Sequence, residues 1–210
     1  MQTNGVTAIS ASWVVPAVQC NFAGYTSNQI SEGIAVWVGF DGIGNVIPEQ
    51  VGSMSFCLNG SPSYWAWEDD QTHGTGNTAG ALAAFGDTSA GDQMTASIAY
   101  LGNNEFQLII KDLTADRSRA YTAIINNAPR ASAEWIVEAF YNMNTGKQAT
   151  LPGFQPITFT DCAAAVNGVS GSITQNNAQP LNMVDSNGNI IVTAENLNQA
   201  GTSIQVAEAS

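Results

Sequence analysis

Short apolar runs alternate with polar turns rich in Gly, Asn, Asp and Ser along the whole chain. Residues 33–40, GIAVWVGF, are continuously apolar and rich in β-branched and aromatic side chains, which predicts a buried strand. Residues 94–100, 105–111 and 119–125 predict three successive strands joined by short turns. Residues 183–194 hold an Asn-Gly pair between two apolar runs, which is typical of a hairpin. Strands at this spacing, without helical periodicity between them, favour an all-β antiparallel sandwich or barrel.

The stretch from Ser132 to Asn142, SAEWIVEAFYN, places two carboxylates in a run that otherwise looks like core. As a strand, it would put Glu134 and Glu138 on one face together with Ile136 and Phe140. As a helix, it would stack Glu134 over Glu138 beside an apolar stripe. The local pattern slightly favours the helix, but the surrounding strands favour a strand, and a strand is what we expect.

The chain is strongly acidic, with 17 Asp and Glu residues against 5 Lys and Arg residues and a formal net charge of −12. Such a chain repels phosphate backbones, so we expect no nucleic-acid partner. The scarcity of bases also limits like-charge repulsion in acid. No run approaches the ~20 apolar residues of a membrane span, and residues 1–10 show no leader pattern. The chain is therefore a mature secreted form or a cytosolic protein. It has no internal repeat or break in composition, which predicts one domain over residues 1–210.

The cysteine and histidine content excludes several chemistries. Cys20, Cys57 and Cys162 lie far apart without a CxxC pair, so a zinc or redox motif is absent. One disulfide with a leftover thiol and no disulfide at all both remain possible. The single histidine, His73, lies in a turn-like stretch and is best interpreted as a solvated loop residue. The sequence has no GxSxG, HExxH or P-loop motif, which leaves acid–base chemistry by carboxylates and amides.

A pepsin-like pair of aspartates is one carboxylate chemistry to consider. Residues 86–91, GDTSAG, superficially resemble the Asp-Thr-Gly/Ser element of pepsin-like proteases. That chemistry needs two such elements, and the nearest second candidate is Asp185-Ser186, before an Asn-Gly turn. Asx-type turns explain both stretches better.

A second carboxylate chemistry is carried by several motifs in a fixed order. They are VWVGFDG (36–42), EQVG (49–52), YWAWED (64–69) and AEWIVE (133–138), with ASWVVP (11–16) before them and PITFTDC (156–162) after them. In order and approximate spacing, they resemble the glutamic peptidases, the eqolisin family of pepstatin-insensitive acid proteases. The resemblance implies a sandwich of two antiparallel seven-stranded sheets, of the concanavalin-like or jelly-roll type, and a catalytic Gln–Glu dyad.

The resemblance also assigns residues. The family's glutamine falls on Gln50, and its glutamate falls on the second acid of AEWIVE, Glu138. Glu134, the same-face neighbour of Glu138, is the alternative if the alignment is two residues off. The positions expected to line the substrate cleft and support the dyad are Trp37, Asp41, Glu68 and Trp67.

The implied activity is acid hydrolysis of peptide bonds by a secreted monomer, without metal or cofactor, on polypeptide substrates. A glutamate in partly apolar surroundings has a raised pKa, which suits acid–base work at low pH. The amide of Gln50 can donate to an oxyanion at any pH. In the family a Trp-containing strand precedes the Val-Pro strand, whereas here the similar NFAGY (21–25) follows it with Phe22 in place of Trp. This departure puts substrate binding in question more than catalysis.

Two non-enzymatic functions are the alternatives. A lectin-like β-sandwich would grip sugars with surface tryptophans, for which Trp65 and Trp67 are the candidates. A purely structural or interaction domain would show neither activity nor ligand.

Overall fold

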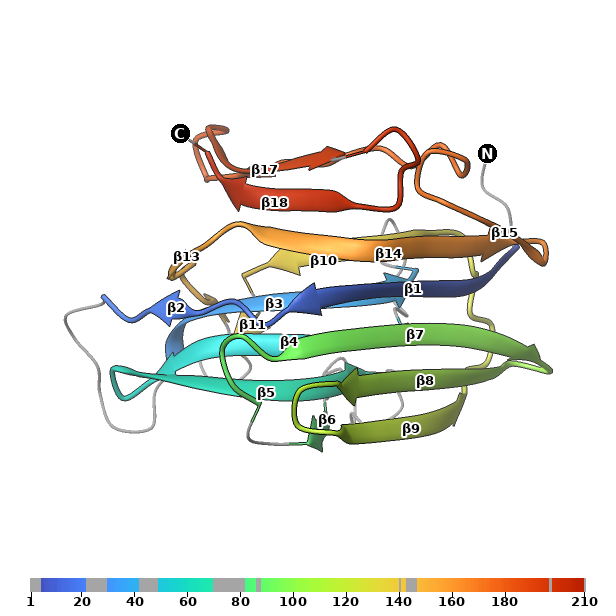
Figure 1. Ribbon diagram of the computed structural model, residues 1–210, viewed down its shortest axis with the longest axis horizontal. Coiled ribbons are helices and arrows are strands. Elements are labelled where there is room, and N and C mark those ends of the chain that lie inside the picture. The colour runs from blue at the N-terminus through green and yellow to red at the C-terminus, as the bar shows by residue number, and fades with distance from the viewer. Residues whose placement is uncertain are drawn as a thin grey trace.

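The computed structural model describes residues 5–21, 30–41, 49–69, 82–85, 88–139, 141–142, 147–196 and 198–209. All of its regular elements are strands, and every pairing between named strands is antiparallel. The all-β expectation is therefore confirmed. Figure 1 shows the strands running along the long axis of the molecule, with β17 and β18 at one edge and β9 at the opposite edge.

The larger sheet has nine strands in the described residues. Its order is β16-β17-β18-β14-β1-β7-β8-β9, with β15 paired to β14. The strands are β1 (Val6–Val14), β7 (Gln93–Gly102), β8 (Glu105–Asp112), β9 (Arg117–Ile124), β14 (Ile157–Val166), β15 (Val169–Gly171), β16 (Met183–Val184), β17 (Ile190–Asn196) and β18 (Ile204–Glu208).

The smaller sheet has five strands in the described residues, in the order β10-β3-β4-β5-β6. They are β3 (Ile30–Phe40), β4 (Glu49–Leu58), β5 (Ser61–Asp69), β6 (Leu82–Phe85) and β10 (Ala133–Glu138). Two short pairs complete the fold: β2 (Val18–Gln19) with β13 (Gly153–Phe154), and β11 (Tyr141–Asn142) with β12 (Lys147–Gln148).

The two sheets pack face to face around one main hydrophobic cluster. Val36 and Val51 of the smaller sheet are buried against Ile9 and Leu108 of the larger sheet, among others. Aromatic side chains also meet across the interface, because the rings of Phe40 and Phe106 lie edge to face with centroids 6.0 Å apart. The residues of this main cluster therefore lie on the inner faces of their strands, which leaves the alternate positions for the outer faces.

The sheets are less even than the two seven-stranded sheets implied by the resemblance. The C-terminal strands β16, β17 and β18 add to the larger sheet beside β14, so this sheet extends further than the smaller one. The smaller sheet ends at β10 on that side. The strands expected near residues 33–40, 94–100, 105–111 and 119–125 are confirmed as β3, β7, β8 and β9.

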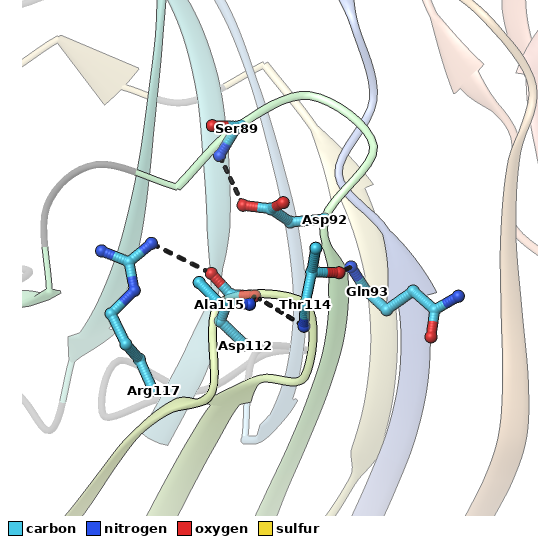
Figure 2. Close-up of polar contacts among 7 residues, drawn as sticks. All are labelled: Ser89, Asp92, Gln93, Asp112, Thr114, Ala115 and Arg117. Atoms are coloured by element: carbon cyan, nitrogen blue, oxygen red, sulfur yellow. Dashed lines mark hydrogen bonds and ion pairs between the residues drawn. The ribbon is translucent and has the colours of Figure 1, made fainter.

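Aspartates close several of the turns, as their positions in the sequence suggest. Between β8 and β9, Asp112 Oδ1 accepts hydrogen bonds from the backbone N–H groups of Thr114 (3.0 Å) and Ala115 (2.9 Å), as Figure 2 shows. Its Oδ2 accepts a hydrogen bond from Arg117 at 3.1 Å. Asp92 similarly caps the turn before β7 (Figure 2). These bonds fix the hairpin registers without long loops.

The structure resolves the open question of the cysteines. Cys20 and Cys57 form a disulfide, with the two Cα atoms 5.6 Å apart. Cys162 is free and buried, and burial raises the pKa of its thiol to about 12.

Candidate active site

The outer face of the smaller sheet carries the candidate site. The strand pairing aligns Glu134 of β10, Gly39 of β3, Gln50 of β4 and Asp69 of β5 in one cross-strand row. Directly paired residues point to the same face of a sheet, so these four positions share the outer face. We call this set the polar row.

Beside the polar row lies an apolar one, two residues further along each strand. Ile136, Trp37, Gly52 and Trp67 align in register, and we call them the aromatic row. Trp37 and Trp67 are both buried, and they form a second hydrophobic cluster that is separate from the main core. The outer face thus has an apolar floor next to acidic and amide groups.

Gly39 leaves a gap between Gln50 and Glu134. Strands in a sheet lie about 4.8 Å apart, so the Cα atoms of these two residues are separated by roughly 10 Å across the glycine. A Cβ atom at Gly39 would lie only 2.5 Å from Trp37 Cζ3 and 2.8 Å from the carbonyl oxygen of Glu49. The edge of the Trp37 indole therefore occupies the space above Gly39, and the amide and the carboxylate flank it.

Glu138 lies in a different row. It pairs with Ala35, four residues along β10 from Glu134, which corresponds to about 13 Å of strand. Its Oε1 accepts a hydrogen bond from Trp37 Nε1 at 3.0 Å. Burial raises the pKa of the Glu138 carboxyl; the bond from Trp37 partly offsets this, and the charge of Glu134 adds to it. The structure does not bring Glu138 and Gln50, the dyad expected from the sequence, into the same row.

Glu134 is the carboxylate that shares the row of Gln50. Its side chain is only 6% exposed, and its Oε1 accepts a hydrogen bond from Ser132 Oγ at 2.7 Å. It also lines a cavity of about 440 Å³ along the edge of β10, together with Ile136, Leu181 and residues of β14 and β18. The side chain of Glu134 is thus fixed by the hydrogen bond from Ser132 and borders the cavity.

Asp41 fixes the start of β10 and does not line the floor of the site. It is fully buried, has a φ of 60°, and directly follows Phe40, the last residue of β3. Its two carboxylate oxygens accept hydrogen bonds from the backbone N–H groups of Arg130 and Ala131, each at 2.6 Å. Through these bonds it positions the segment that leads directly to Glu134.

Glu68 faces away from the site, whereas Trp67 faces it. Glu68 pairs with Val51 on the inner face and is 2% exposed. It accepts hydrogen bonds from Arg119 of β9 at 3.4 Å, which makes it an ion pair between the sheets. Consecutive strand residues point to opposite faces, so Trp67 and Glu68 do not both line one cleft. The strand register thus places Glu68 on the face opposite Trp67.

The alternatives from the sequence can also be located. Trp65 is 41% exposed but Trp67 only 5%, so they do not form the pair of surface tryptophans that a lectin-like site requires. Asp185 caps the hairpin turn before β17, accepting hydrogen bonds from Asn187 and Asn189. Asp87 of the pepsin-like stretch lies outside the described residues, as do His73 and residues 22–25 of NFAGY.

Three features of the site were missed in the sequence. Asp69 flanks Gln50 in the polar row on the side away from Gly39. Gly39 and Gly52 allow the Trp37 indole to lie against the sheet, because a Cβ at either position would collide with Trp37. The signal available was the alternation of positions 65, 67 and 69 in β5, which places Asp69 on the face of the two tryptophans. Among the described residues, no group of three or more His, Cys, Asp and Glu side chains could hold a metal ion.

Comparisons with known proteins agree with this fold. The chain matches the model of the peptidase A4 family over residues 1–206. It is similar to the solved structure of scytalido-glutamic peptidase with a transition state analog inhibitor, at 20% identity and a TM-score of 0.77, over 100% of this chain and 95% of that one. No curated protein matches the chain in sequence.

Two further solved structures share the fold. SCP-B, a member of the eqolisin family in a complex with the tripeptide Ala-Ile-His, is 20% identical with a TM-score of 0.72, over 100% of this chain and 94% of that one. Aspergilloglutamic peptidase from Aspergillus niger is 20% identical with a TM-score of 0.70, over 85% of this chain and 99% of that one. The resemblance inferred from the motifs is therefore confirmed. Since the family model spans nearly the whole chain, the protein belongs to the peptidase A4 family, the eqolisins, and is a peptide hydrolase of that family.

Proposed function

We propose that this protein is an acid endopeptidase in which Gln50 and Glu138 act together on the scissile peptide bond. The observation that carries the proposal is the setting of Glu138, which lies on the same face of the smaller sheet as Gln50, accepts a hydrogen bond from Trp37 at 3.0 Å and has the pKa of its carboxyl raised by burial. Peptide hydrolysis needs a base for water, a donor for the oxyanion and an acid for the leaving amine. One carboxyl group and one amide are sufficient for these three tasks.

The reaction would proceed in two proton transfers. The Glu138 carboxylate takes a proton from a water molecule as the water oxygen bonds to the carbonyl carbon of the substrate. The side-chain NH₂ of Gln50 donates a hydrogen bond to the oxygen that becomes negative, and it does so at any pH. Glu138 then gives the proton to the amide nitrogen, the C–N bond breaks, and both products leave.

Glu134 is the alternative carboxyl for this role. In its favour is its place in the row of Gln50. Against it is the indole of Trp37, whose edge occupies the space above Gly39, between Glu134 and Gln50. Variants of the two glutamates therefore separate the two assignments.

The surroundings of the site favour activity at low pH on unfolded polypeptides. A chain with 17 acids and 5 bases carries little positive charge when its carboxyls are protonated, so the fold tolerates acid that unfolds substrates. The tripeptide bound to SCP-B supports a polypeptide substrate. The Cys20–Cys57 disulfide supports secretion, since disulfides persist in oxidising compartments. The described part of the chain contains no helix long and apolar enough to cross a membrane. We further propose a monomer that needs no metal or cofactor.

The test is hydrolysis of a reduced and alkylated protein between about pH 2 and pH 7. Parallel reactions would contain pepstatin, which targets paired aspartates, and EDTA, which removes metal ions. We expect cleavage at acidic pH that neither reagent slows. Cleavage that pepstatin abolishes would contradict the proposed chemistry, and an absence of cleavage at every pH would contradict the activity.

A further inference from the structure

We propose that the open edge of β10 binds the polypeptide substrate, holding a segment that flanks the scissile bond as an added strand. This inference rests on the proposed peptidase activity and adds to it a second surface for the substrate. We call this surface, residues 131–137, the β10 edge. It belongs to the strand that carries Glu138, so a chain bound along it is already close to the catalytic carboxyl.

The backbone of β10 pairs with a neighbour on one side only. β10 is the last strand of the smaller sheet, and in the described residues it pairs with β3 alone. The backbone N–H of Asp41 donates to the carbonyl oxygen of Ser132 at 3.3 Å. Bonded positions alternate along an antiparallel pair, so the even-numbered residues of β10 bond to β3. The N–H and C=O groups of Ala133, Trp135 and Val137 therefore point away from the sheet, and no backbone group in the described part of the chain pairs with them.

The sequence of β10 lacks the usual features that block a further strand. Exposed edge strands commonly carry Lys, Pro or a bulge, which prevents pairing with another chain. β10 (AEWIVE) contains no Lys or Pro, and its register with β3 is unbroken from Ala133 to Glu138. The edge strand β9 of the larger sheet, in contrast, carries Arg117 and Arg119. The β10 edge is thus a regular template for an extended chain.

The cavity of about 440 Å³ described above follows this edge. Its lining includes every residue from 131 to 137, whose side chains alternate between the two faces of the strand. The cavity therefore runs along the edge of β10 and not over one face. Its opposite wall is largely apolar and includes Ala164 of β14, Val206 of β18 and Leu181. Leu181 is 67% exposed, which leaves a large apolar side chain beside the outward-pointing backbone groups.

An extended polypeptide matches both features of this surface. Its backbone can bond to the outward groups of β10, while every second side chain enters the apolar cavity, as in other cases of strand addition. The described residues that line the cavity include one carboxylate, Glu134, and no Lys or Arg. Apolar and neutral polar side chains are therefore favoured in the bound segment. An unfolded polypeptide, the proposed substrate, presents such segments, whereas its folded form pairs its own strands.

The experiment compares peptide substrates of different length by steady-state kinetics. A short peptide is taken from a site that the enzyme cleaves in the reduced and alkylated protein. Two longer versions carry six further residues, alternating valine and threonine, at the N-terminal or the C-terminal end; six is the length of β10. We expect kcat/KM to rise about 10- to 100-fold for the extension at one end. The gain should come mainly from a lower KM, because the added contacts are made equally before and during the reaction.

Methylation of the backbone nitrogens in the favoured extension tests the strand pairing itself. Only alternate N–H groups of an added strand face β10. Methylating one alternate set of three residues should therefore abolish the gain in kcat/KM, and methylating the other set should leave most of it. The side chains are the same in both peptides, so the comparison isolates the backbone hydrogen bonds.

A matched pair of variants tests the apolar wall. Leu181→Asn should bring kcat/KM for the extended peptide down toward that of the short peptide and leave the short peptide unaffected. Val169→Asn replaces a residue that is 73% exposed on β15, outside the cavity, and should leave both values unchanged. In a ¹⁵N spectrum, the extension added as a separate peptide should shift the backbone amide signals of Ala133, Trp135 and Val137.

Several results would overturn the inference while the short peptide is still cleaved. Equal kcat/KM for all the peptides would show that the edge binds no substrate. A gain that both methylated peptides keep, or that both lose, would exclude strand pairing. A stable dimer whose three amide signals do not respond to the peptide would assign the edge to a second copy of the chain. A wild-type protein that cleaves neither the peptides nor an unfolded protein would instead reject the proposed function, and the inference with it.

Discussion

Among single residues, Glu138 gives the clearest link between local environment and pH. Its carboxyl is buried beside an indole, and its pKa lies above the ordinary glutamate range in the folded protein. The folded state therefore binds this proton more tightly than the unfolded chain does. The resulting contribution to the free energy of unfolding is complete below the ordinary pKa and is lost as the pH rises through the raised value.

Glu138→Gln should remove this pH dependence, because an amide cannot ionise. We expect the melting temperature of the variant, relative to wild type, to be higher at pH 7 than at pH 3. Thermal unfolding followed by circular dichroism at the two pH values measures the difference. Glu195→Gln, on the exposed side of β17, is the matched control for replacing a glutamate by glutamine. An equal difference at both pH values would contradict the assignment.

The family motifs assigned Gln50 and Trp37 to one site, and the strand register gives them a common face. They assigned the catalytic glutamate of AEWIVE to Glu138, with Glu134 as the alternative. These two glutamates are four residues apart, so alternation puts both on the same face of β10. The register adds that Glu134 shares the row of Gln50, whereas Glu138 pairs with Ala35. Glu68 is a different case, since alternation in β5 was enough to place it opposite Trp67.

Among the secondary-structure elements, β10 depends on contacts made before it begins. The two carboxylate oxygens of Asp41 accept bonds from the backbone N–H groups of Arg130 and Ala131, at 2.6 Å each. The strand then pairs with β3 from Ala133 to Glu138. This pairing with β3 also explains why the segment is a strand although its local pattern suits a helix.

Asp41→Ala should therefore affect both stability and activity. It leaves two partly buried N–H groups without their carboxylate acceptors, at a cost of about 1 kcal/mol for each group. It also loosens the segment that positions Glu134. Urea unfolding gives the first effect, and the rate of peptide hydrolysis under conditions where the variant is folded gives the second. Asp185→Ala, in the exposed turn of the C-terminal hairpin, is the control for losing a turn aspartate. If Asp41→Ala unfolds at the same urea concentration as wild type, the two hydrogen bonds that Asp41 accepts do not stabilise the fold.

On the scale of the whole molecule, a sandwich with a large and a small sheet is fastened by one disulfide. Cys20 follows β2 and Cys57 lies in β4, at a sequence separation of 37. The sequence could not choose between a disulfide and free thiols, because the choice depends on the approach of segments that are far apart along the chain. In the fold, Cys57 is fully buried and Cys162 lies elsewhere, in β14.

Replacing both bridged cysteines by serine should destabilise the protein by about 2–4 kcal/mol, since the bridge restricts a loop of this size in the unfolded chain. Denaturant unfolding of the double variant and of wild type, each with and without reductant, measures the change. Reductant should lower the midpoint of wild type and leave that of the double variant unchanged. A wild-type midpoint that does not respond to complete reduction would contradict this expectation.

The most direct test of the whole account compares Glu134→Gln, Glu138→Gln and Gln50→Ala in hydrolysis of an unfolded protein at acidic pH. Circular dichroism of each variant at that pH establishes that it is folded. We expect Glu138→Gln to lose roughly 10³- to 10⁴-fold in kcat and Gln50→Ala about 10²- to 10³-fold, while Glu134→Gln keeps more activity than either. An active Glu138→Gln beside an inactive Glu134→Gln would contradict the account and move the catalytic carboxyl to Glu134.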